Sequence, residues 1–133
     1  MKEVVEFLKE NVTGAFATVE DGKPKVRPFQ FMLEDEGKFF FCTSNEKDVC
    51  KQLKANPYFE FSSCSPKFAW IRLSGKAQFS DDLKIKEKIL EANGLVKSIY
   101  KTADNPIFEI FYIDHGTAIL ADFSGQPART INF

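Results

Sequence analysis

The sequence predicts one mainly β domain, an antiparallel barrel of about six or seven strands with short α-helices at its periphery. Three observations lead to this class. Strand-like runs follow one another through hairpin turns, the helical patterns between them are brief, and strands and helices do not alternate as in a parallel sheet. With 133 residues there is room for one hydrophobic core, so residues 1–133 are expected to form a single domain.

Composition excludes several classes of protein. Hydrophobic residues make up 44% and charged residues 28% of the chain, which is typical of a folded protein. The 18 basic and 19 acidic residues nearly cancel, so neither nucleic acid nor an anionic membrane is an expected partner. No apolar run has the length of a membrane span and the first residues lack a signal-peptide core, so we expect a cytoplasmic protein.

The N-terminal half is predicted to hold a helix followed by strands. Apolar residues at helical spacing indicate an amphipathic helix over residues 2–10. Three strands come next, with Asp-Gly at 21–22 as a tight hairpin turn. They are residues 15–20, 24–33 and 38–43. Residues 46–55 return to helical spacing and end at Asn56-Pro57, because the residue before a proline avoids the helical conformation.

The C-terminal half continues with four strands and two helical pieces. The strands are residues 58–62, 69–79, 107–113 and 117–123, and the helical pieces are 81–93 and 95–99. Gly75 predicts a bulge or bend in the long strand that contains it. Asp81-Asp82 suits a helix start, and Asn93-Gly94 has the composition of a helix C-cap. The last two strands are predicted to pair with each other across the Asp-His-Gly turn at 114–116.

Several of these strands are apolar on both faces, although a small barrel buries only its interior. The outer face therefore needs a second cover. An identical subunit supplies such a cover most economically, so we expect a homodimer. The 15 phenylalanines would fill the barrel or this interface.

Cysteine and histidine usage bears on the chemistry. Cys42, Cys50 and Cys64 contain no C-x-x-C pair, so we expect reduced thiols and neither a disulfide framework nor a metal site. His115 is the only histidine and falls in a predicted turn, where a solvated side chain is the first interpretation. No side chain is therefore assigned a catalytic role.

Arg27 and Pro28 mark one candidate binding segment. The residue before a proline is held extended, and Pro28 lacks the N–H group of an ordinary strand residue. The strand is expected to be irregular here and to offer backbone groups to a flat heteroaromatic ligand, while the Arg27 guanidinium would bind a phosphate or the oxygen atoms of the ring. The alternative is a solvated arginine at a sheet edge.

A second candidate segment is the Thr-Ser-Asn-Glu-Lys stretch at 43–47. Thr43 and Glu46 fit a T-x-x-E capping box, which is a purely structural interpretation. Hydroxyl residues ahead of a helix also present free N–H groups to an anion. Lys47 and Lys51, in the first turns of the predicted helix, favour a negative partner. A phosphate monoester would then be held by Arg27, Thr43, Ser44 and Lys47.

Three segments together resemble a known family. They are Arg-Pro-Phe-Gln-Phe at 27–31, Phe-Cys-Thr-Ser-Asn-Glu-Lys-Asp-Val at 41–49 and Gln-Leu-Lys-Ala-Asn-Pro at 52–57. In order and spacing the chain resembles the pyridoxamine 5′-phosphate oxidase-like flavoproteins over nearly its whole length. It is most similar to the small group that includes nitroimidazole-resistance reductases. The resemblance implies a split β-barrel that dimerises and holds two FMN molecules at the subunit interface.

The resemblance also implies which residues bind FMN. The isoalloxazine ring would be lined by Arg27, Pro28, Phe29, Gln30, Phe31 and Met32. The phosphate would be surrounded by Arg27, Thr43, Ser44 and Lys47, with Asn45, Lys51 and Gln52 as further candidates. Trp70 and Arg72 would belong to the ring environment or the dimer contact, with core packing as the alternative for Trp70.

The activity implied by the resemblance is that of an FMN-dependent oxidoreductase, similar to a flavin reductase, a nitroreductase or pyridoxamine phosphate oxidase. It would transfer electrons between NADH or NADPH and a small-molecule substrate. The flavin carries this chemistry, which accounts for the lack of a catalytic triad. The alternative is a protein that binds flavin, deazaflavin or haem for storage or sensing without turnover.

Overall fold

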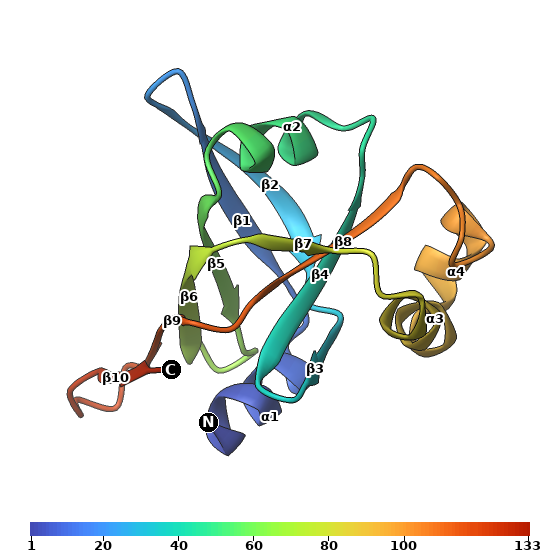
Figure 1. Cartoon of the computed structure of the whole chain (residues 1–133). Helices are drawn as coiled ribbons and strands as arrows, with labels where there is room; N and C mark the ends of the chain where they lie inside the picture. The colour runs from blue at the N-terminus through green and yellow to red at the C-terminus, as the bar shows by residue number, and fades with distance from the viewer.

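Ten strands in two antiparallel sheets form the frame of this computed structural model, which describes residues 1–133 (Figure 1). The strands are β1 (Thr13–Glu20), β2 (Lys23–Gln30), β3 (Leu33–Asp35), β4 (Lys38–Ser44), β5 (Tyr58–Cys64), β6 (Trp70–Lys76), β7 (Gln78–Ser80), β8 (Phe108–Ile113), β9 (Gly116–Ala121) and β10 (Arg129–Asn132). The helices are α1 (Lys2–Glu10), α2 (Asp48–Ala55), α3 (Leu83–Ala92) and α4 (Gly94–Tyr100). One sheet has the order β10-β9-β6-β5-β1-β2 and the other β3-β4-β8-β7. The predicted class, a mainly β antiparallel split barrel with short helices, is confirmed.

Phenylalanine fills the space between the sheets. Phe16 on β1 stacks against Phe59 on β5 with ring centroids 4.6 Å apart, and Phe41 on β4 stacks against Phe111 on β8 at 5.6 Å. Phe16, Phe41 and Phe111 have no exposed surface. Each buried ring of this size contributes about 1.5–3 kcal/mol, so the core accounts for much of the phenylalanine content.

Strand β4 lies between two hydrophobic clusters. Its side chains alternate, so Phe39 and Phe41 enter the cluster between the sheets while Phe40 and Cys42 pack into a second cluster on the other face. That second cluster also contains Ile85, Ile89, Leu90, Val96, Tyr100, Phe108 and Ile110. For β4 and β8, the cover that the sequence predicts from an identical subunit is therefore supplied by the chain's own helices α3 and α4.

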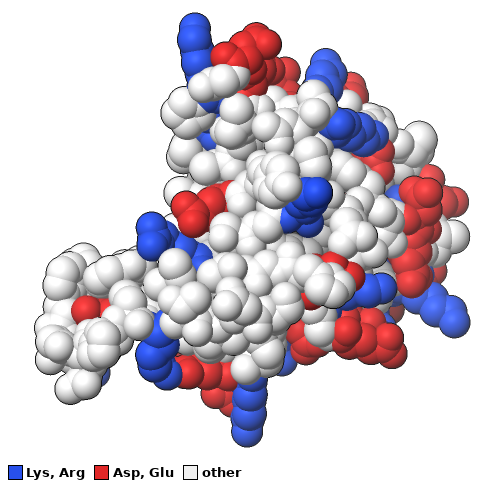
Figure 2. Space-filling model, turned by 60° about the vertical axis from the view of Figure 1, so that its left-hand side comes forward, with Lys and Arg blue, Asp and Glu red and all other residues white.

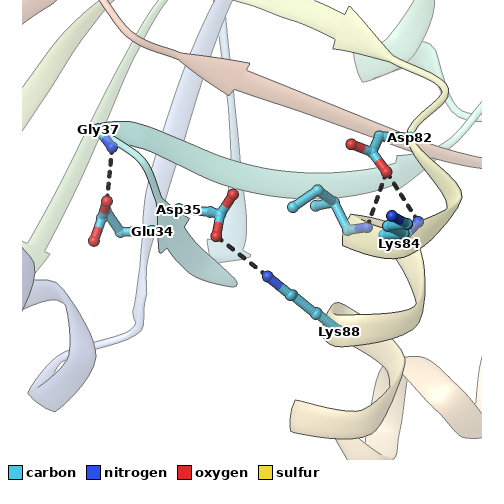
Figure 3. Close-up of polar contacts among 7 residues, drawn as sticks. Glu34, Asp35, Gly37, Asp82, Lys84 and Lys88 are labelled. Atoms are coloured by element: carbon cyan, nitrogen blue, oxygen red, sulfur yellow. Dashed lines mark hydrogen bonds and ion pairs between the residues drawn. The ribbon is translucent and has the colours of Figure 1, made fainter.

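Two tight turns use left-handed backbone conformations. Asp21 and Gly22 have φ angles of 52° and 73° in the predicted turn between β1 and β2. Glu36 and Gly37, with φ angles of 51° and 81°, connect β3 to β4. Figure 3 shows that the Glu34 carboxylate accepts a hydrogen bond from Gly37 N, at 2.8 Å, which closes the second turn.

Helix α3 is fixed at its start and along its length (Figure 3). As predicted, Asp82 is its N-cap, and its side chain accepts hydrogen bonds from Lys84 N at 2.9 Å and Ile85 N at 3.4 Å. Further along the helix, Lys88 Nζ lies 3.3 Å from the Asp35 carboxylate on β3. These contacts hold α3 beside the four-stranded sheet.

The junction between α3 and α4 differs from the predicted glycine C-cap. Asn93 ends α3 in an extended conformation, and its side chain accepts a hydrogen bond from Val96 N at 3.1 Å. Asn93 is therefore also the N-cap of α4, and Gly94 is the first residue of that helix. Because α4 follows α3 directly, Asn93 caps the first N–H groups of α4. No glycine in a left-handed conformation ends α3.

The last two predicted strands do not pair with each other. Strand β8 pairs with β4 and β7, whereas β9 pairs with β6 and β10. The turn at 114–116 thus carries the chain from one sheet to the other. The predicted strand 69–79 also changes sheets: it divides at Ala77 into β6 and β7, and Ala77 N donates to Pro57 O at 2.8 Å.

Gly75 does not form a bulge in β6, contrary to one of the two predicted outcomes. It stays paired in the sheet, opposite Gly116 on β9. A Cβ atom added to either glycine would collide with Ile113 Cδ1 on the other sheet. Glycine is needed here because the two sheets approach each other closely at this corner.

Strand β10, which the sequence does not predict, pairs with β9 and is joined to α1 by the ion pair between Arg129 and Glu3. In Figure 1 the segment leading into β10 projects at the lower left.

Figure 2 shows basic and acidic side chains interspersed over one face of the molecule. None of the helices is long and apolar enough to cross a bilayer.

Candidate functional site

Two adjoining grooves contain most of the residues predicted to bind a cofactor. The first, which we call the Arg27 groove, has a volume of about 500 Å³ and is lined by Lys25, Val26, Arg27, Pro28, Phe29, Lys47, Asp48, Val49 and Gln52. The second, the α4 groove, has a volume of about 290 Å³ and is lined by Thr13, Pro28, Phe29, Gln30, Met32, Cys42, Thr43, Lys47, Leu95, Val96, Ile99 and Tyr100. Pro28, Phe29 and Lys47 line both grooves, which together form the candidate site.

Arg27 is held in place by three neutral oxygen atoms. Its Nη1 donates to Phe16 O at 3.1 Å and Thr18 Oγ1 at 2.8 Å, and its Nη2 donates to Gln52 Oε1 at 2.7 Å. Burial lowers the pKa of Arg27, and the Asp48 carboxylate raises it by a smaller amount. No carboxylate forms an ion pair with the guanidinium. A guanidinium has five N–H donors, so Arg27 is an oriented cation with two donors unused.

Lys47 precedes α2, which begins at Asp48, two residues later than the predicted helix start. Lys47 is the N-cap of this helix, and no side chain caps its first N–H groups. Its ammonium group forms no ion pair. Together with Lys25 and Arg27, it gives the Arg27 groove three cations against a single carboxylate, that of Asp48.

The capping box predicted from Thr43 and Glu46 does not form. Thr43 lies within β4 and is 2% exposed, and its Oγ1 has no hydrogen-bond partner. Ser44 Oγ accepts the hydrogen bond from Glu46 N instead, at 3.1 Å. A buried hydroxyl without a partner is costly. Thr43 also lines the α4 groove, with its unpartnered hydroxyl oxygen buried beneath the groove surface.

The segment predicted to line the flavin ring follows the edge of the six-stranded sheet. Strand β2 is the last strand of that sheet, so one side of its backbone has no strand partner. The irregularity predicted at Pro28 is absent, since pairing with β1 continues through Pro28, which faces Ala15. The predicted strand 24–33 instead ends at Gln30, and Phe31 N donates to Val12 O at 2.8 Å.

The structure brings eight of the predicted cofactor residues to the two grooves. They are Arg27, Pro28, Phe29, Gln30, Met32, Thr43, Lys47 and Gln52. The other four lie elsewhere. Phe31 is buried in the core, Ser44 supports the turn before α2, and Lys51 is exposed on α2. Asn45 binds the chain before β8, where its Nδ2 donates to Pro106 O at 2.8 Å.

Helix α4 borders the site although no sequence pattern places it there. Its residues in the α4 groove are Leu95, Val96, Ile99 and Tyr100. The helix start is tied to β2 because Asn93 Nδ2 donates to Gln30 Oε1 at 3.3 Å. This contact joins positions 63 apart in the chain, so only tertiary structure reveals it.

Cys42 and Tyr100, which the sequence does not assign to the site, carry perturbed acidities. Burial raises the pKa of the Cys42 thiol to about 12, and nearby Lys47 opposes the shift. Burial also raises the pKa of the Tyr100 phenol to about 12, to which Cys42 adds. Both groups therefore remain protonated at neutral pH.

Trp70, Arg72 and His115 lie outside the two grooves. Trp70 packs against Phe123 with ring centroids 5.1 Å apart and lines a separate groove beside α1. Arg72 is exposed on β6. The exposed His115 ring lies 2.9 Å from the Asp114 carboxylate.

Known proteins resemble the chain in sequence and in structure. The family model described as pyridoxamine 5′-phosphate oxidase matches residues 1–114. The crystal structure of a NimC/NimA family protein from Clostridium acetobutylicum is 37% identical, with a TM-score of 0.91, over 100% of this chain and 92% of that chain. No curated protein sequence matches the chain.

Two further solved structures share the fold at lower identity. A pyridoxamine 5′-phosphate oxidase-related, FMN binding protein from Nostoc punctiforme is 17% identical, with a TM-score of 0.73, over 97% of this chain and 86% of that chain. A heme binding protein from Mycobacterium smegmatis is 18% identical, with a TM-score of 0.77, over 93% of this chain and 54% of that chain.

Proposed function

Because the chain belongs to the pyridoxamine 5′-phosphate oxidase family, we propose that it is an FMN-dependent oxidoreductase acting on a small molecule. The observation that carries the proposal is the Arg27 groove, where three cations face one carboxylate and Arg27 keeps two unused N–H donors. A phosphate monoester carries about two negative charges and three acceptor oxygens. It therefore matches both the charge and the hydrogen-bonding capacity of this groove.

Each part of the proposed FMN site has a separate task. Arg27 and Lys47 would bind the phosphate in the Arg27 groove, and the unpartnered Thr43 hydroxyl would approach it from the adjoining α4 groove. The unpaired edge of β2 would supply backbone groups that orient the ring. When bound, FMN would supply the redox chemistry by which NADH or NADPH reduces the acceptor.

The groove residues bear on the choice between a flavin and a haem. The Nostoc punctiforme protein is FMN binding and the Mycobacterium smegmatis protein is heme binding, and both share this fold. Cysteine and tyrosine ligate haem iron as anions. Cys42 and Tyr100 are the groove residues of those types, and burial raises the pKa of each to about 12. Neither residue is therefore a preformed anionic ligand for haem iron.

The proposed enzyme is a homodimer, as the family resemblance implies. Nine large apolar side chains are exposed on the single chain, and the most exposed are Val26 and Phe68, each at 65%, and Phe123 at 80%. Burying such groups favours association. Sedimentation velocity is expected to give twice the 15.2 kDa mass of the chain.

A comparison of FMN with riboflavin tests the phosphate site. Riboflavin has the same ring but no phosphate, so Lys47→Ala should weaken FMN binding about tenfold or more and leave riboflavin affinity unchanged. Lys9→Ala, an exposed change on α1, is the matched control and should alter neither affinity. Fluorescence titration measures both ligands. The proposal fails if the wild-type protein does not bind FMN, or if Lys47→Ala affects both ligands equally.

A second measurement separates an enzyme from a protein that binds flavin without turnover. Oxidation of NADH and NADPH by the FMN-loaded protein is followed with several acceptors and compared with free FMN at the same concentration. An oxidoreductase should exceed the rate of free FMN. A bound flavin with no rate above that of free FMN would favour storage or sensing.

A further inference from the structure

A separate groove, which we call the α1 groove, lies between α1 and the ends of β6 and β9, away from the candidate FMN site. Its volume is about 320 Å³, and its apolar lining includes Phe7, Trp70 and Leu120. Leu120 belongs to the hydrophobic cluster between the sheets, and Phe7 packs against that cluster. Pockets for small ligands begin at about 300 Å³ and combine an apolar lining with a few polar groups. The groove therefore has the size and the apolar surface of a small-ligand site.

The charged residues around this apolar lining are mostly acidic. Four carboxylates, those of Glu3, Glu6, Glu10 and Asp122, line the groove with a single guanidinium, that of Arg129. Arg129 is already paired with Glu3, whereas Glu10 and Asp122 form no ion pair. A hydrogen bond from Ser124 lowers the pKa of Asp122, so this carboxylate is ionised at neutral pH. The groove thus has the opposite charge to the Arg27 groove and attracts cations.

Trp70 adds an aromatic surface that is not yet used by a cation. Four lysines elsewhere in the chain lie over the rings of other aromatic residues, but no basic group lies over Trp70, whose aromatic neighbour is Phe123. Among aromatic side chains, tryptophan attracts a cation most strongly. An ammonium group in the α1 groove would therefore meet both carboxylates and a suitable aromatic residue.

The carboxylates are too dispersed to bind a metal ion. No three acidic, cysteine or histidine side chains converge as metal ligands. Glu6 and Glu10 are four residues apart on α1, which places them about 6 Å apart along the helix axis, and Asp122 approaches from the segment after β9. Separate negative charges beside an apolar surface match a ligand whose positive charges are joined by an apolar chain.

We propose that the α1 groove binds a linear aliphatic amine with two or more ammonium groups. Its methylene chain packs on the apolar lining, and its ammonium groups meet the unpaired carboxylates and Trp70. The site is distinct from the proposed FMN site, because none of its lining residues lines the Arg27 groove or the α4 groove. It therefore adds a second ligand to the proposed function.

Two amines of equal chain length test this inference. 1,5-Diaminopentane and 1-aminopentane share five carbon atoms and differ by one ammonium group. In ¹⁵N-amide NMR titrations of the FMN-loaded protein, the diamine should bind about threefold to fivefold more tightly than the monoamine. Its shift changes should be concentrated in α1 and residues 120–127. Magnesium chloride at the same concentration, which has two charges and no apolar chain, should not reproduce them.

A pair of double variants with equal charge separates this groove from the overall charge of the protein. Glu10→Gln combined with Asp122→Asn changes two exposed groove residues and should weaken diamine binding about fivefold or more while leaving FMN affinity unchanged. The control, Glu87→Gln combined with Glu91→Gln, removes two exposed carboxylates from α3 and should leave the diamine affinity unchanged.

Four outcomes would overturn the inference. They are equal binding of the two amines, shift changes that magnesium reproduces, an equal loss of affinity in both double variants, and the absence of any shift change in α1. The last outcome would also be expected if a second copy of the chain covered the groove. All four leave the proposed FMN site untouched, because that site is tested by FMN and riboflavin titrations at other residues.

Discussion

Arg27 and Gln52 lie on β2 and α2, 25 positions apart, yet Arg27 Nη2 donates a 2.7 Å hydrogen bond to Gln52 Oε1. The same oxygen accepts a hydrogen bond from Thr18 Oγ1 at 2.6 Å, and Gln52 is only 6% exposed. Gln52, which the family resemblance implies as a cofactor contact, therefore has a clear positioning role: it orients the cation of the Arg27 groove.

Gln52→Leu should destabilise the protein and weaken FMN binding together. The change removes an oxygen that accepts two hydrogen bonds and leaves donors of Thr18 and Arg27 unsatisfied. The expected loss is about 1–3 kcal/mol of unfolding free energy, measured by urea denaturation. Gln126→Leu, at an exposed glutamine, should stay within about 0.5 kcal/mol of the wild type. Unchanged stability of Gln52→Leu would contradict the positioning role.

Gly75→Ala should destabilise the protein because the new methyl group would collide with Ile113 Cδ1 and lie 2.9 Å from His115 O. Overpacking of this kind costs about 1–3 kcal/mol, which chemical denaturation would detect. Gly94→Ala is the matched control, since no atom lies within 4 Å of the added Cβ and alanine favours the helix. Equal stability of the two variants would show that the corner tolerates a side chain.

The three cysteines should react with iodoacetamide in a fixed order. Cys64 is exposed, whereas Cys50 is buried and burial raises the pKa of Cys42 to about 12. The thiolate is the reactive form, so at pH 8 the folded protein should be labelled at Cys64 first. Peptide mass spectrometry would locate the label, with urea-unfolded protein as the control in which all three react. Rapid labelling of Cys42 in the folded protein would contradict the prediction that burial keeps this thiol protonated and unreactive.

The ion pair between Glu3 and Arg129 should stabilise the folded protein at pH values above the ordinary pKa of glutamate. A hydrogen bond from Arg129 holds the pKa of Glu3 below 4.5. A lowered folded-state pKa adds stability at neutral pH, and this stability is lost as the pH falls through the lowered value. Glu3→Gln should therefore melt slightly below the wild type at neutral pH, and the difference should close in acid. A difference that stays constant with pH, or that also occurs in Glu87→Gln, would exclude this linkage.

Elements with strong local signals are the ones that the sequence predicts correctly. The helix at 2–10, the turn at 21–22 and the Asp82 cap each depend on residues close together in the chain. The turn at 114–116 has the same kind of signal but a different outcome. A short turn can close a hairpin or carry the chain between sheets, and the packing of β8 against β4 decides between them.

The candidate site likewise contains residues that local sequence predicts and residues that only tertiary packing brings to it. Local sequence and the family resemblance predict Arg27, Thr43 and Lys47 as site residues, and the structure brings all three to the adjoining grooves. The capping box at Thr43 is wrong because β4 extends to Ser44 and α2 begins only at Asp48. The contribution of α4 depends on packing between segments distant in the chain, which neither periodicity nor a motif reports.

The α4 groove lies against both hydrophobic clusters that pack on opposite faces of β4, so a molecule bound there affects the stability of both. Phe29 packs against the cluster between the sheets, while Val96 and Tyr100 belong to the other cluster, and all three line this groove. A molecule seated there contacts both clusters at once. Its binding free energy opposes the opening of either one, so occupancy should couple their local unfolding and slow amide hydrogen exchange in α4 and β2 together.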